Sequence, residues 1–494
     1  MTRIYSDQEK IRREKLNELI NHNLNPYLIE TITTNTNIAS LTQQFSQAAA
    51  EELLIQTTPW TLTGRVMAIR QTFLVLKKEN AKLQIYFNKK HLDPLILDQL
   101  KKYVDIGDLL WVEGNLFFTK LGELTLNVQN FQIIAKCLHP LPEKHHGLKD
   151  PELRLRKRYL DAIVNDEILA TFKMRSQVIN YMREFLVQDG YLEVETPFLN
   201  PTLGGAAARP FITKHNTLDQ DFYLRIALEL PLKKMVVAGF DKVFEIGRCF
   251  RNEGMDATHN PEYTSLEMYT AFEGMEQTIN RCEALVKYIS AKTQIHQVHW
   301  NQVDIDLTPP FQRVSMAELV KAKTGIDFYH ETVNLDQALK LADQYQISLK
   351  PHQKTVGHIF TLLFEHLCEA DLIQPTFVYG HHKDVSPLAK ADPHHPDFTL
   401  RFELFIGKKE IANGFAELND PIDQLNRFEA QLQEASLGND EANEIDHEFI
   451  DALEYGLVPT GGLGVGVDRL VMIFTQQDTI KNVIFFPHLK KENK

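Results

Sequence analysis

The chain has little cysteine, no long apolar run and no apolar segment at its amino terminus. No stretch of about 18 apolar residues occurs, so no membrane-spanning helix is expected. The first residues, Met1 to Asp7, lack the apolar core of a secretory signal. Four cysteines are scattered without CxxC spacing, which argues against a zinc site and a disulfide framework. These absences favour a protein of the reducing cytoplasm that has no membrane partner.

Histidine occurs in adjacent pairs, which raises the question of a metal site. The pairs are His145–His146, His381–His382 and His394–His395. They lie in polar stretches without partners at the spacing of metal ligands. We therefore expect polar loops at these pairs, and metal binding is the less favoured interpretation.

Negative charge is in excess but unevenly distributed. The formal net charge is −13, which would be unusual for a nucleic-acid-binding protein. Residues 1–150, however, hold slightly more Lys and Arg than Asp and Glu, so the acidic excess lies in the remainder. The first part could meet a polyanion, while the second has carboxylates available for magnesium and for a cationic substrate.

The length predicts two or more domains. Residues 1–58 form a helical extension, in which Ser6 and Glu9 make a capping-box pattern that opens a helix ending near Asn21. The basic side chains of that helix are Lys10, Arg12, Arg13 and Lys15. We expect them to form a solvated face, with contact to a nucleic-acid backbone as the alternative.

The remaining chain divides by pattern into a β-rich domain, a linker and a larger domain. Residues 59–138 are β-rich, residues 139–165 are a Pro-punctuated linker, and residues 166–494 alternate helices with long antiparallel strands. The strands expected in the β-rich part are Leu62–Ile69, Thr72–Lys78, Lys82–Phe87, Asp108–Phe118 and Glu123–Ile134, with a helix over Asp93–Tyr103 before the fourth. This order fits an OB-fold, and the whole chain fits the α+β class.

OB-folds bind single-stranded nucleic acid by stacking and edge contacts. On the second and third expected strands, Phe73 and Gln84 could supply such contacts. The alternative for Phe73 is a place in the barrel core.

Chemistry-bearing residues gather in a hairpin between two further expected strands. Lys242–Arg248 and Tyr263–Tyr269 have strand patterns, and the loop between them holds an Arg, two Glu and a His. Because residues two apart on an extended chain share a face, Arg251 and Glu253 should point one way. By the same spacing, Tyr263, Glu267 and Tyr269 should share a face. Such a cleft suits an anionic nucleotide and a cationic partner, and the alternative is a solvated polar loop.

Two further segments have glycine or charged residues in positions that could bind a ligand or a metal ion. The Gly-rich run Gly462–Met472 enters a helix that begins near Arg469, and its glycines would let a ligand approach the backbone. Glu403 and Glu410 flank a probable turn at Gly407, which would place them diagonally on one face. Two carboxylates at that separation repel unless a cation lies between them, so a magnesium site is expected, with a charged hairpin as the alternative.

These segments together resemble the signatures of class II aminoacyl-tRNA synthetases. The matching runs are Val178–Pro197, Phe250–Tyr269 and Gly462–Met472. Finer matches to lysyl-tRNA synthetases are Gly204–Phe211, Arg401–Phe405 and Glu410–Asp420. The resemblance extends from about Thr61 to Pro487, and it implies an OB-fold followed by a class II catalytic domain.

The resemblance implies activation of L-lysine with ATP to lysyl-adenylate and pyrophosphate, followed by transfer to tRNA(Lys). It implies a homodimer through Val178–Pro197 and magnesium at Glu403 and Glu410. The implied ATP-binding residues are Arg251, Glu253, His259, Asn260, Tyr263, Gly464 and Arg469, with Arg251 and Arg469 catalytic. The implied lysine-binding residues are Gly205, Glu229, Glu267, Tyr269, Asn413, Phe415 and Glu417. Phe73 and Gln84 would read the anticodon.

The chain departs from the family pattern at several points. The connection between Arg65 and Phe73 looks short, and Asn130 stands where Glu is common. Leu228 and Pro231 replace the Pro and Tyr usual around the matching Glu, so the local backbone could differ. The opposite strand parity of Glu410 and Glu417 requires a break in phase near Ala412 or Gly414.

Three rival functions deserve comparison with lysine–tRNA ligation. A sibling synthetase for aspartate or asparagine would need Arg or Lys where this chain has Glu267 and Glu417. A synthetase that lysylates another acceptor is disfavoured by the OB-like domain. A nucleic-acid-binding module with an inactive second domain is disfavoured because Arg251, Glu403 and Arg469 are all present.

Overall fold

The computed structural model describes most of the chain. The described residues are 4–46, 52–53, 58–90, 92–142, 148–206, 208–439 and 445–491. The histidine pair His145–His146 lies outside them, as does Ala207 of the run Gly204–Phe211. Among the described residues, none of the helices combines the length and apolarity needed to cross a membrane.

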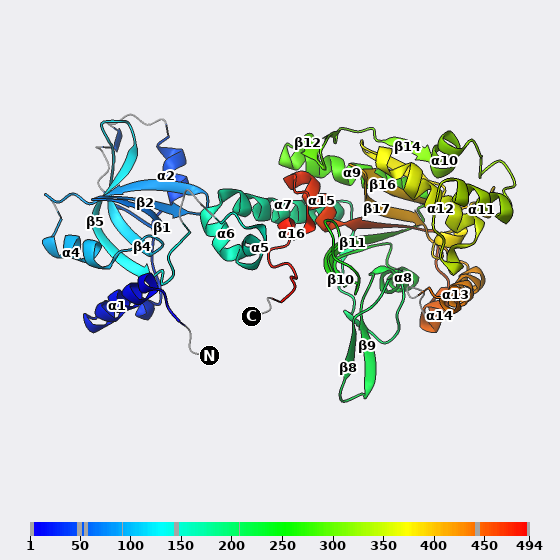
Figure 1. Ribbon diagram of the computed structural model, residues 1–494, viewed down its shortest axis with the longest axis horizontal. Helices are drawn as coiled ribbons and strands as arrows, with labels where there is room; N and C mark the ends of the chain where they lie inside the picture. The colour runs from blue at the N-terminus through cyan, green and yellow to red at the C-terminus, as the bar shows by residue number, and fades with distance from the viewer. Residues whose placement is uncertain are drawn as a thin grey trace. The chain divides into compact units, whose positions relative to one another are not determined.

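The chain forms two compact units, Met1–Ala170 and Thr171–Lys494. The division falls inside the long helix α7, Asp166–Gln188 (Figure 1). The domain bounds expected at residues 58, 138 and 165 stay predictions. The stretch expected as a linker includes two short helices, α5 Pro151–Arg156 and α6 Arg158–Val164.

The first unit contains a closed five-stranded barrel in the order β1-β2-β3-β5-β4. Its strands are β1 Trp60–Arg70, β2 Phe73–Lys78, β3 Ala81–Tyr86, β4 Leu109–Phe118 and β5 Leu124–Ala135, and α4, Pro94–Tyr103, precedes β4. All strand pairs are antiparallel except β3 with β5, which closes the barrel. The expected OB-fold is confirmed, and each expected strand end lies within two residues of the observed one.

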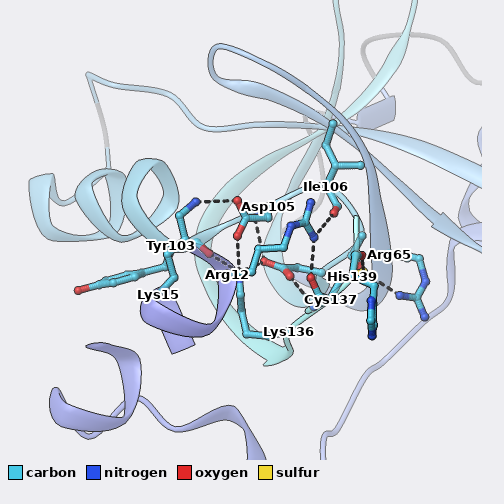
Figure 2. Close-up of polar contacts among 11 residues, drawn as sticks. Arg12, Lys15, Arg65, Tyr103, Asp105, Ile106, Lys136, Cys137 and His139 are labelled. Atoms are coloured by element: carbon cyan, nitrogen blue, oxygen red, sulfur yellow. Dashed lines mark hydrogen bonds and ion pairs between the residues drawn. The ribbon is translucent and has the colours of Figure 1, made fainter. Parts of the chain in front are cut away.

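Helix α1, Asp7–Asn21, begins with the predicted capping box between Ser6 and Glu9. Its expected solvated basic face is wrong for two of its residues. Arg12 is only 7% exposed and donates to the carbonyls of Ile106 (3.0 Å) and Cys137 (2.5 Å). Lys15 donates to the Asp105 carboxylate at 2.6 Å, a contact drawn in Figure 2. These charges satisfy groups of the barrel and therefore attach the helix to it.

The segment after α1 also packs on the barrel. It contains η1, Pro26–Leu28, and α2, Ile38–Gln44, whose Ile38 and Leu41 are fully buried in the barrel core. A Cβ atom at Gly64 would lie 2.9 Å from Leu76 Cβ and 3.2 Å from Ile38 Cδ1. Glycine on β1 therefore permits the close approach of α2.

The second unit is built on an eight-stranded sheet in the order β14-β15-β16-β17-β18-β11-β10-β6. The strands are β6 Leu192–Glu193, β10 Lys242–Phe250, β11 Glu262–Ala271, β14 Gln312–Ser315, β15 Thr376–Tyr379, β16 Arg401–Ile406, β17 Lys409–Ala416 and β18 Thr460–Gly466. Among the described residues of this sheet, only β14–β15 and β10–β6 pair in parallel. The prediction of a mostly antiparallel sheet flanked by helices is confirmed.

Helices cover both faces of this sheet (Figure 1). On one face α7, α9 Met275–Thr293 and α15 Val467–Thr475 enclose the larger core. On the other face lie α8 Glu229–Val237, α13 Pro421–Ser436 and α14 His447–Glu454, and a further group of α10 Met316–Thr324, α11 Leu335–Gln344 and α12 Val356–Leu367. The second face holds the cavity described below.

Smaller elements complete the second unit. These are β7 Leu199–Asn200, β8 Ile212–His215, β9 Gln220–Leu224, β12 Gln297–Trp300, β13 Val303–Asp306, α16 Ile480–Val483, η2 Pro351–Gln353, η3 Glu369–Asp371 and η4 Lys383–Val385. Strands β8 and β9 project from the sheet as a hairpin (Figure 1).

Candidate active site

A cavity of about 880 Å³ opens on the second face of the sheet. Its lining comes from β11, β16, β17, β18, α8, α12, α15 and the loop after β10. It brings together all the residues that the sequence assigned to ATP, lysine and magnesium. They are Gly205, Glu229, Arg251, Glu253, His259, Asn260, Tyr263, Glu267, Tyr269, Glu403, Glu410, Asn413, Phe415, Glu417, Gly464 and Arg469.

The β10–β11 hairpin places the central residues of the cavity. Tyr263, Glu267 and Tyr269 lie on one face of β11, as their spacing predicted. Arg251 and Glu253 are expected to point one way on an extended chain, and β10 ends just before them, at Phe250. Both residues project from the following loop and still line the cavity.

Arg251 lies in the middle of the cavity without a full set of partners. Its guanidinium carbon is 5.3 Å from the ring centre of Tyr263, whose hydroxyl donates to the carbonyl of Ile226 at 3.2 Å. The Nε atom of Arg251 is buried, and no hydrogen-bond partner for it exists among the described residues. A buried donor in this state is costly unless a ligand satisfies it, so Arg251 is suited to an anion.

Arg469 lies near the start of α15, at one end of the cavity. It donates to the carbonyl of Glu410 (2.7 Å) and contacts His259 Nε2 (3.1 Å). His259 Nδ1 is 2.7 Å from Asp256 Oδ2, so the ring is held between the two. Arg469, His259 and Asp256 therefore form a continuous polar network at this end of the cavity, and such a network is suited to phosphate groups.

Asp468 fixes the position of α15, and the sequence did not reveal this role. Its carboxylate accepts from the backbone N–H of Thr264 (2.7 Å) and from Arg175 (2.5 Å). Arg469 follows directly and is thereby held against β11. The only sequence signal was an acid in the first turn of a helix, which is common for reasons of helix electrostatics.

Glu403 and Glu410 lie on neighbouring strands, as expected from the turn between them. Phe405 pairs with Glu410, and Glu403 pairs with Asn413. Between these pairs the register shifts, so that Ile411 is one extra residue on β17. This β-bulge is the predicted break in phase, located one residue before Ala412. It lets Glu410 and Asn413 face the same cavity.

Two further carboxylates approach this pair. Glu365 on α12 and Glu369 in η3 both line the cavity. Burial and the charges of Glu369, Glu403 and Glu410 raise the pKa of Glu365 to about 7. Burial and Glu403 likewise raise the pKa of Glu410. Sequence reasoning missed Glu365 and Glu369 because they come from α12 and η3, and only the packing of these elements on the sheet brings them to the site.

The opposite end of the cavity is also acidic. Glu267 accepts hydrogen bonds from the N–H of Leu228 (3.1 Å) and from the Tyr269 hydroxyl (3.0 Å). Burial and the charge of Glu229 raise the pKa of Glu267 to about 7. Glu417 is 1% exposed, and burial raises its pKa well above the ordinary value. Such a site favours positively charged ligands.

Glycine and proline shape the backbone around these carboxylates. A Cβ atom at Gly462 would lie 1.9 Å from Glu417 Oε1 and 2.7 Å from Tyr269 Cε1, so glycine leaves the space that both side chains use. Glu229 is the first residue of α8, and Pro231 is the third. Proline is compatible with the first turn, where the N–H has no helical partner. The helix therefore accommodates this departure from the family pattern.

Lys233 is the most important residue that sequence reasoning missed in this region. It is fully buried, and its ammonium forms ion pairs with Glu229 (2.5 Å) and with Glu417. The only signal in the sequence was a Glu followed four residues later by a Lys on a helix. That spacing is typical of exposed ion pairs and does not by itself indicate a buried one.

Of the histidines that occur in pairs within the described residues, His381 lines the cavity, whereas His382, His394 and His395 do not. His381 and His382 are buried, and His382 Nδ1 lies 3.4 Å from Asp384 Oδ1. The ring of His395 packs on Tyr329, with 3.7 Å between the ring centres. Within the described part of the chain, no three His, Cys, Asp or Glu side chains are placed to hold a metal ion by themselves.

The barrel presents a separate aromatic surface. Phe73 stacks on Tyr86 with 4.5 Å between ring centres and an interplanar angle of 24°. It is half-buried and lies outside the barrel core, so the core alternative does not hold. Gln84 donates to the Thr125 hydroxyl at 3.0 Å. The short connection before Phe73 is a tight turn in which Gln71 has a positive φ of 55°.

Beside Tyr86 the barrel has a hollow of about 230 Å³. Asn115, Phe117 and Asn127 line it. The buried Oδ1 atoms of Asn115 and Asn127 have no hydrogen-bond partner among the described residues. Sequence reasoning did not select these residues, because polar positions on alternate strand residues are common on barrel surfaces.

Comparison with known proteins agrees with this geometry. Residues 150–490 match the family described as tRNA synthetases class II (D, K and N), and residues 60–134 match the OB-fold nucleic acid binding domain. The lysine–tRNA ligase of Malacoplasma penetrans is 51% identical over 99% of both chains. That of Ureaplasma urealyticum serovar 10 is 49% identical over 100% of both, and that of Mycoplasmoides gallisepticum is 48% identical over 100% of both. The chain therefore belongs to the lysine–tRNA ligase family of class II tRNA synthetases.

Proposed function

We propose that this protein activates L-lysine with ATP and transfers it to tRNA(Lys). The observation that supports this most directly is the incompletely paired Arg251 guanidinium between an acidic end and a polar, Arg-containing end of one cavity. A ligand with two ammonium groups and one carboxylate fits the acidic end with its carboxylate toward Arg251. An aspartate or asparagine side chain would instead meet Glu267 and Glu417, which favours lysine over those substrates.

The chemical step is attack of the lysine carboxylate oxygen on the α-phosphorus of ATP, with pyrophosphate leaving. Arg251 would contact the attacking carboxylate and the α-phosphate, where negative charge changes most in the transition state. Arg469 would bind the distal phosphates, with Glu253, His259 and Asn260 around the nucleotide. Positioning and charge neutralisation suffice for this reaction, so no covalent nucleophile is required.

The lysine itself would be held from both ends. Glu229, with the backbone at Gly205, would bind the α-ammonium. Glu267, Tyr269 and Glu417 would bind the ε-ammonium, and Asn413 and Phe415 would line the aliphatic part. Tyr263 and Gly464 would border the adenine.

Magnesium fits the carboxylates Glu403 and Glu410, the second of which lies beside Arg469. Glu403 and Glu410 are hard oxygen donors on one face, and their mutual repulsion contributes to the raised pKa of Glu410. Two carboxylates supply too few ligands alone, which suits an ion that completes its shell with phosphate oxygens and water. Bound there, Mg²⁺ would supply positive charge beside the phosphates of ATP.

The proposal also covers how the tRNA is recognised, how two protomers associate and where in the cell the enzyme acts. Phe73 and Gln84 would stack on and contact anticodon bases, and the hollow at Asn115 and Asn127 extends that surface. A homodimer would form through the Val178–Pro197 region, where β6 is an edge strand and Leu192 is 49% exposed. The four cysteines are free, as suits the cytoplasm, where we place the enzyme.

Amino-acid-dependent exchange of pyrophosphate into ATP tests the proposed activity. Lysine should drive the exchange in the presence of Mg²⁺, and aspartate and asparagine should not. Exchange driven by aspartate or asparagine would overturn the substrate assignment, and exchange with no amino acid would overturn the reaction.

A further inference from the structure

An ammonium group of the protein itself lies behind two carboxylates of the acidic end of the cavity, Glu229 and Glu417. Lys233 lies on α8 with no exposed side-chain surface. Its Nζ atom is 2.5 Å from Glu229 Oε1 and is also ion-paired with Glu417 Oε2. The rings of Phe415 and Phe449 flank it, with Nζ 5.5 Å and 5.8 Å from their centres.

The two carboxylates that Lys233 contacts come from different elements. Glu229 begins α8, and Glu417 follows β17. In the proposed function they bind opposite ends of the same substrate, the α-ammonium and the ε-ammonium. One internal cation joined to both therefore fixes the distance between the two recognition groups.

The charges in this part of the cavity balance only if Lys233 is counted. The carboxylates that line this part of the cavity are Glu229 from α8, Glu267 from β11 and Glu417 beyond β17, with Tyr269 from β11 among them, and Lys233 pairs with Glu229 and Glu417. A bound lysine brings two ammonium groups and sends its carboxylate toward Arg251. Three carboxylates then meet three ammonium groups, which is the condition for burying such a cluster without residual charge.

The ion pair with Lys233 also leaves one carboxylate oxygen of Glu417 available to bind the substrate. The Lys233 ammonium forms an ion pair with Oε2, whereas Oε1 has neither an ion pair nor a hydrogen-bond partner among the described residues and lies against Gly462 in the cavity wall. Burial raises the pKa of the Glu417 carboxyl, and the nearby ammonium opposes that rise. Without Lys233, a proton would be the remaining way to neutralise this carboxylate.

Resting on the proposed function, we infer that Lys233 is a positioning residue for lysine recognition. It would hold Glu229 and Glu417 in register with the two amines of the substrate and keep Glu417 ionised. It would contact neither ATP nor the reacting carboxylate, so its effect should be confined to the amino acid.

The test uses Lys233→Met, which keeps the length of the side chain and removes its charge. Lys234→Met is the matched control, because Lys234 is the next residue and pairs with the exposed Glu448. In pyrophosphate exchange, Lys233→Met should raise the KM for lysine by about tenfold or more, with the KM for ATP within about twofold. Its lysine kcat/KM should reach its plateau at a higher pH than in the wild type, because Glu417 then holds a proton that lysine must displace.

Lys233→Arg keeps the charge and changes its geometry, so it provides a second test if Lys233→Met fails to fold. Its pH profile should match the wild type, while its KM for lysine rises and its KM for ATP does not. A lysine KM within twofold of the wild type in either folded variant would overturn the inference. Absence of lysine-dependent exchange in the wild type would instead overturn the proposed function on which the inference rests.

Discussion

At the scale of single residues, Arg251 has a buried donor, Nε, without a hydrogen-bond partner among the described residues. Such a group lowers the stability of the free protein and is retained where a ligand completes its hydrogen bonds. Its partner in the structure is the face of the Tyr263 ring, which restrains the guanidinium without neutralising it. Arg251 is therefore preorganised for an anion that forms during the reaction.

Replacement of Arg251 by Ala should abolish most lysine activation without unfolding the protein. Loss of a donor that acts on the transition state typically costs about 2.7–4 kcal/mol, or roughly a hundred- to a thousandfold in rate. Pyrophosphate exchange and thermal unfolding measured on the same sample check this expectation. Activity within about tenfold of the wild type would show that Arg251 is only a structural element of the loop.

Glu267 should make lysine binding sensitive to pH. Its pKa in the ligand-free cavity is raised to about 7 by burial and by Glu229, so the carboxyl is largely protonated below that pH. The substrate ammonium favours the ionised form, so binding below about pH 7 must release a proton. Lysine affinity should fall as pH decreases from about 7 to 5 and be nearly constant just above 7.

Calorimetric titration of lysine in buffers of different ionisation enthalpy measures this proton release directly. Glu267→Gln should bind lysine more weakly and with little dependence on pH. The raised pKa of Glu267 affects folding in the opposite sense. The protonated carboxyl of Glu267 contributes to the stability of the folded protein at low pH, and this contribution is lost as pH rises from 4.5 to about 7. Equal affinity for lysine at pH 5 and pH 7 would contradict the expectation.

Substitutions at two glycines of β18 should distinguish the ATP end of the cavity from its lysine end. A Cβ atom at Gly464 would make ordinary contacts, 3.7 Å from Asn413 O and from Glu267 Cγ, so the protein alone tolerates alanine there. Gly464→Ala should keep the melting temperature and raise the KM for ATP. Gly462→Ala would displace Glu417 Oε1, so it should raise the KM for lysine and lower the melting temperature. The reverse pattern of KM changes would show that the two ends are assigned wrongly.

At the scale of elements, the first helix is held by charge as well as by apolar packing. Arg12 satisfies two carbonyls of the barrel unit, and Lys15 pairs with Asp105 (Figure 2). Asp105 in turn contacts the buried Lys136, which also pairs with Asp108. The helix is therefore part of a polar network that extends into the barrel.

Arg12→Ala should lower the free energy of unfolding of the first unit by about 1.5–3 kcal/mol, because it removes charge-assisted hydrogen bonds and leaves two carbonyls unpaired. Lys10→Ala is the control, because its pair with Asp7 is exposed and worth little. Hydrogen exchange of the barrel amides in the full-length protein measures the difference. Equal protection in the two variants would mean that apolar packing alone holds the helix. Lysine-dependent exchange should be unaffected in both.

Elements with a strong local pattern could be predicted, and contacts between distant segments could not. The β10–β11 hairpin and the barrel strands follow from alternation and turn residues. The position of the β17 bulge did not, because Ile411 and Ala412 are both apolar and both buried. Glu365 and Lys233 escaped prediction for another reason. Their spacing is ordinary for a helix. Only the packing of α8 and α12 against the sheet brings them next to the other charged side chains of the site.

At the scale of the whole molecule, the described residues form a charge-rich cavity in the second compact unit and a surface with half-buried stacked aromatic rings in the first. The proposed reaction has two stages that need them differently. Formation of the adenylate requires only the cavity, whereas charging of tRNA also requires recognition of the anticodon. A substitution on the barrel should therefore separate the two stages.

Phe73→Ala should weaken tRNA charging and spare adenylate formation. Phe73 is half-buried and stacks on Tyr86, so its truncation removes an aromatic platform without opening the barrel core. Loss of one base-stacking contact is worth about 1–3 kcal/mol, which should appear as a higher KM for tRNA(Lys). Lysine-dependent pyrophosphate exchange measured without tRNA should be unchanged.

Leu121→Ala is the matched control, because Leu121 is 97% exposed on the same barrel. If Phe73→Ala lowers the melting temperature well below that of Leu121→Ala, the ring is structural. An unchanged KM for tRNA(Lys) would place anticodon recognition on other residues of the barrel, of which Asn115 and Asn127 are the next to test.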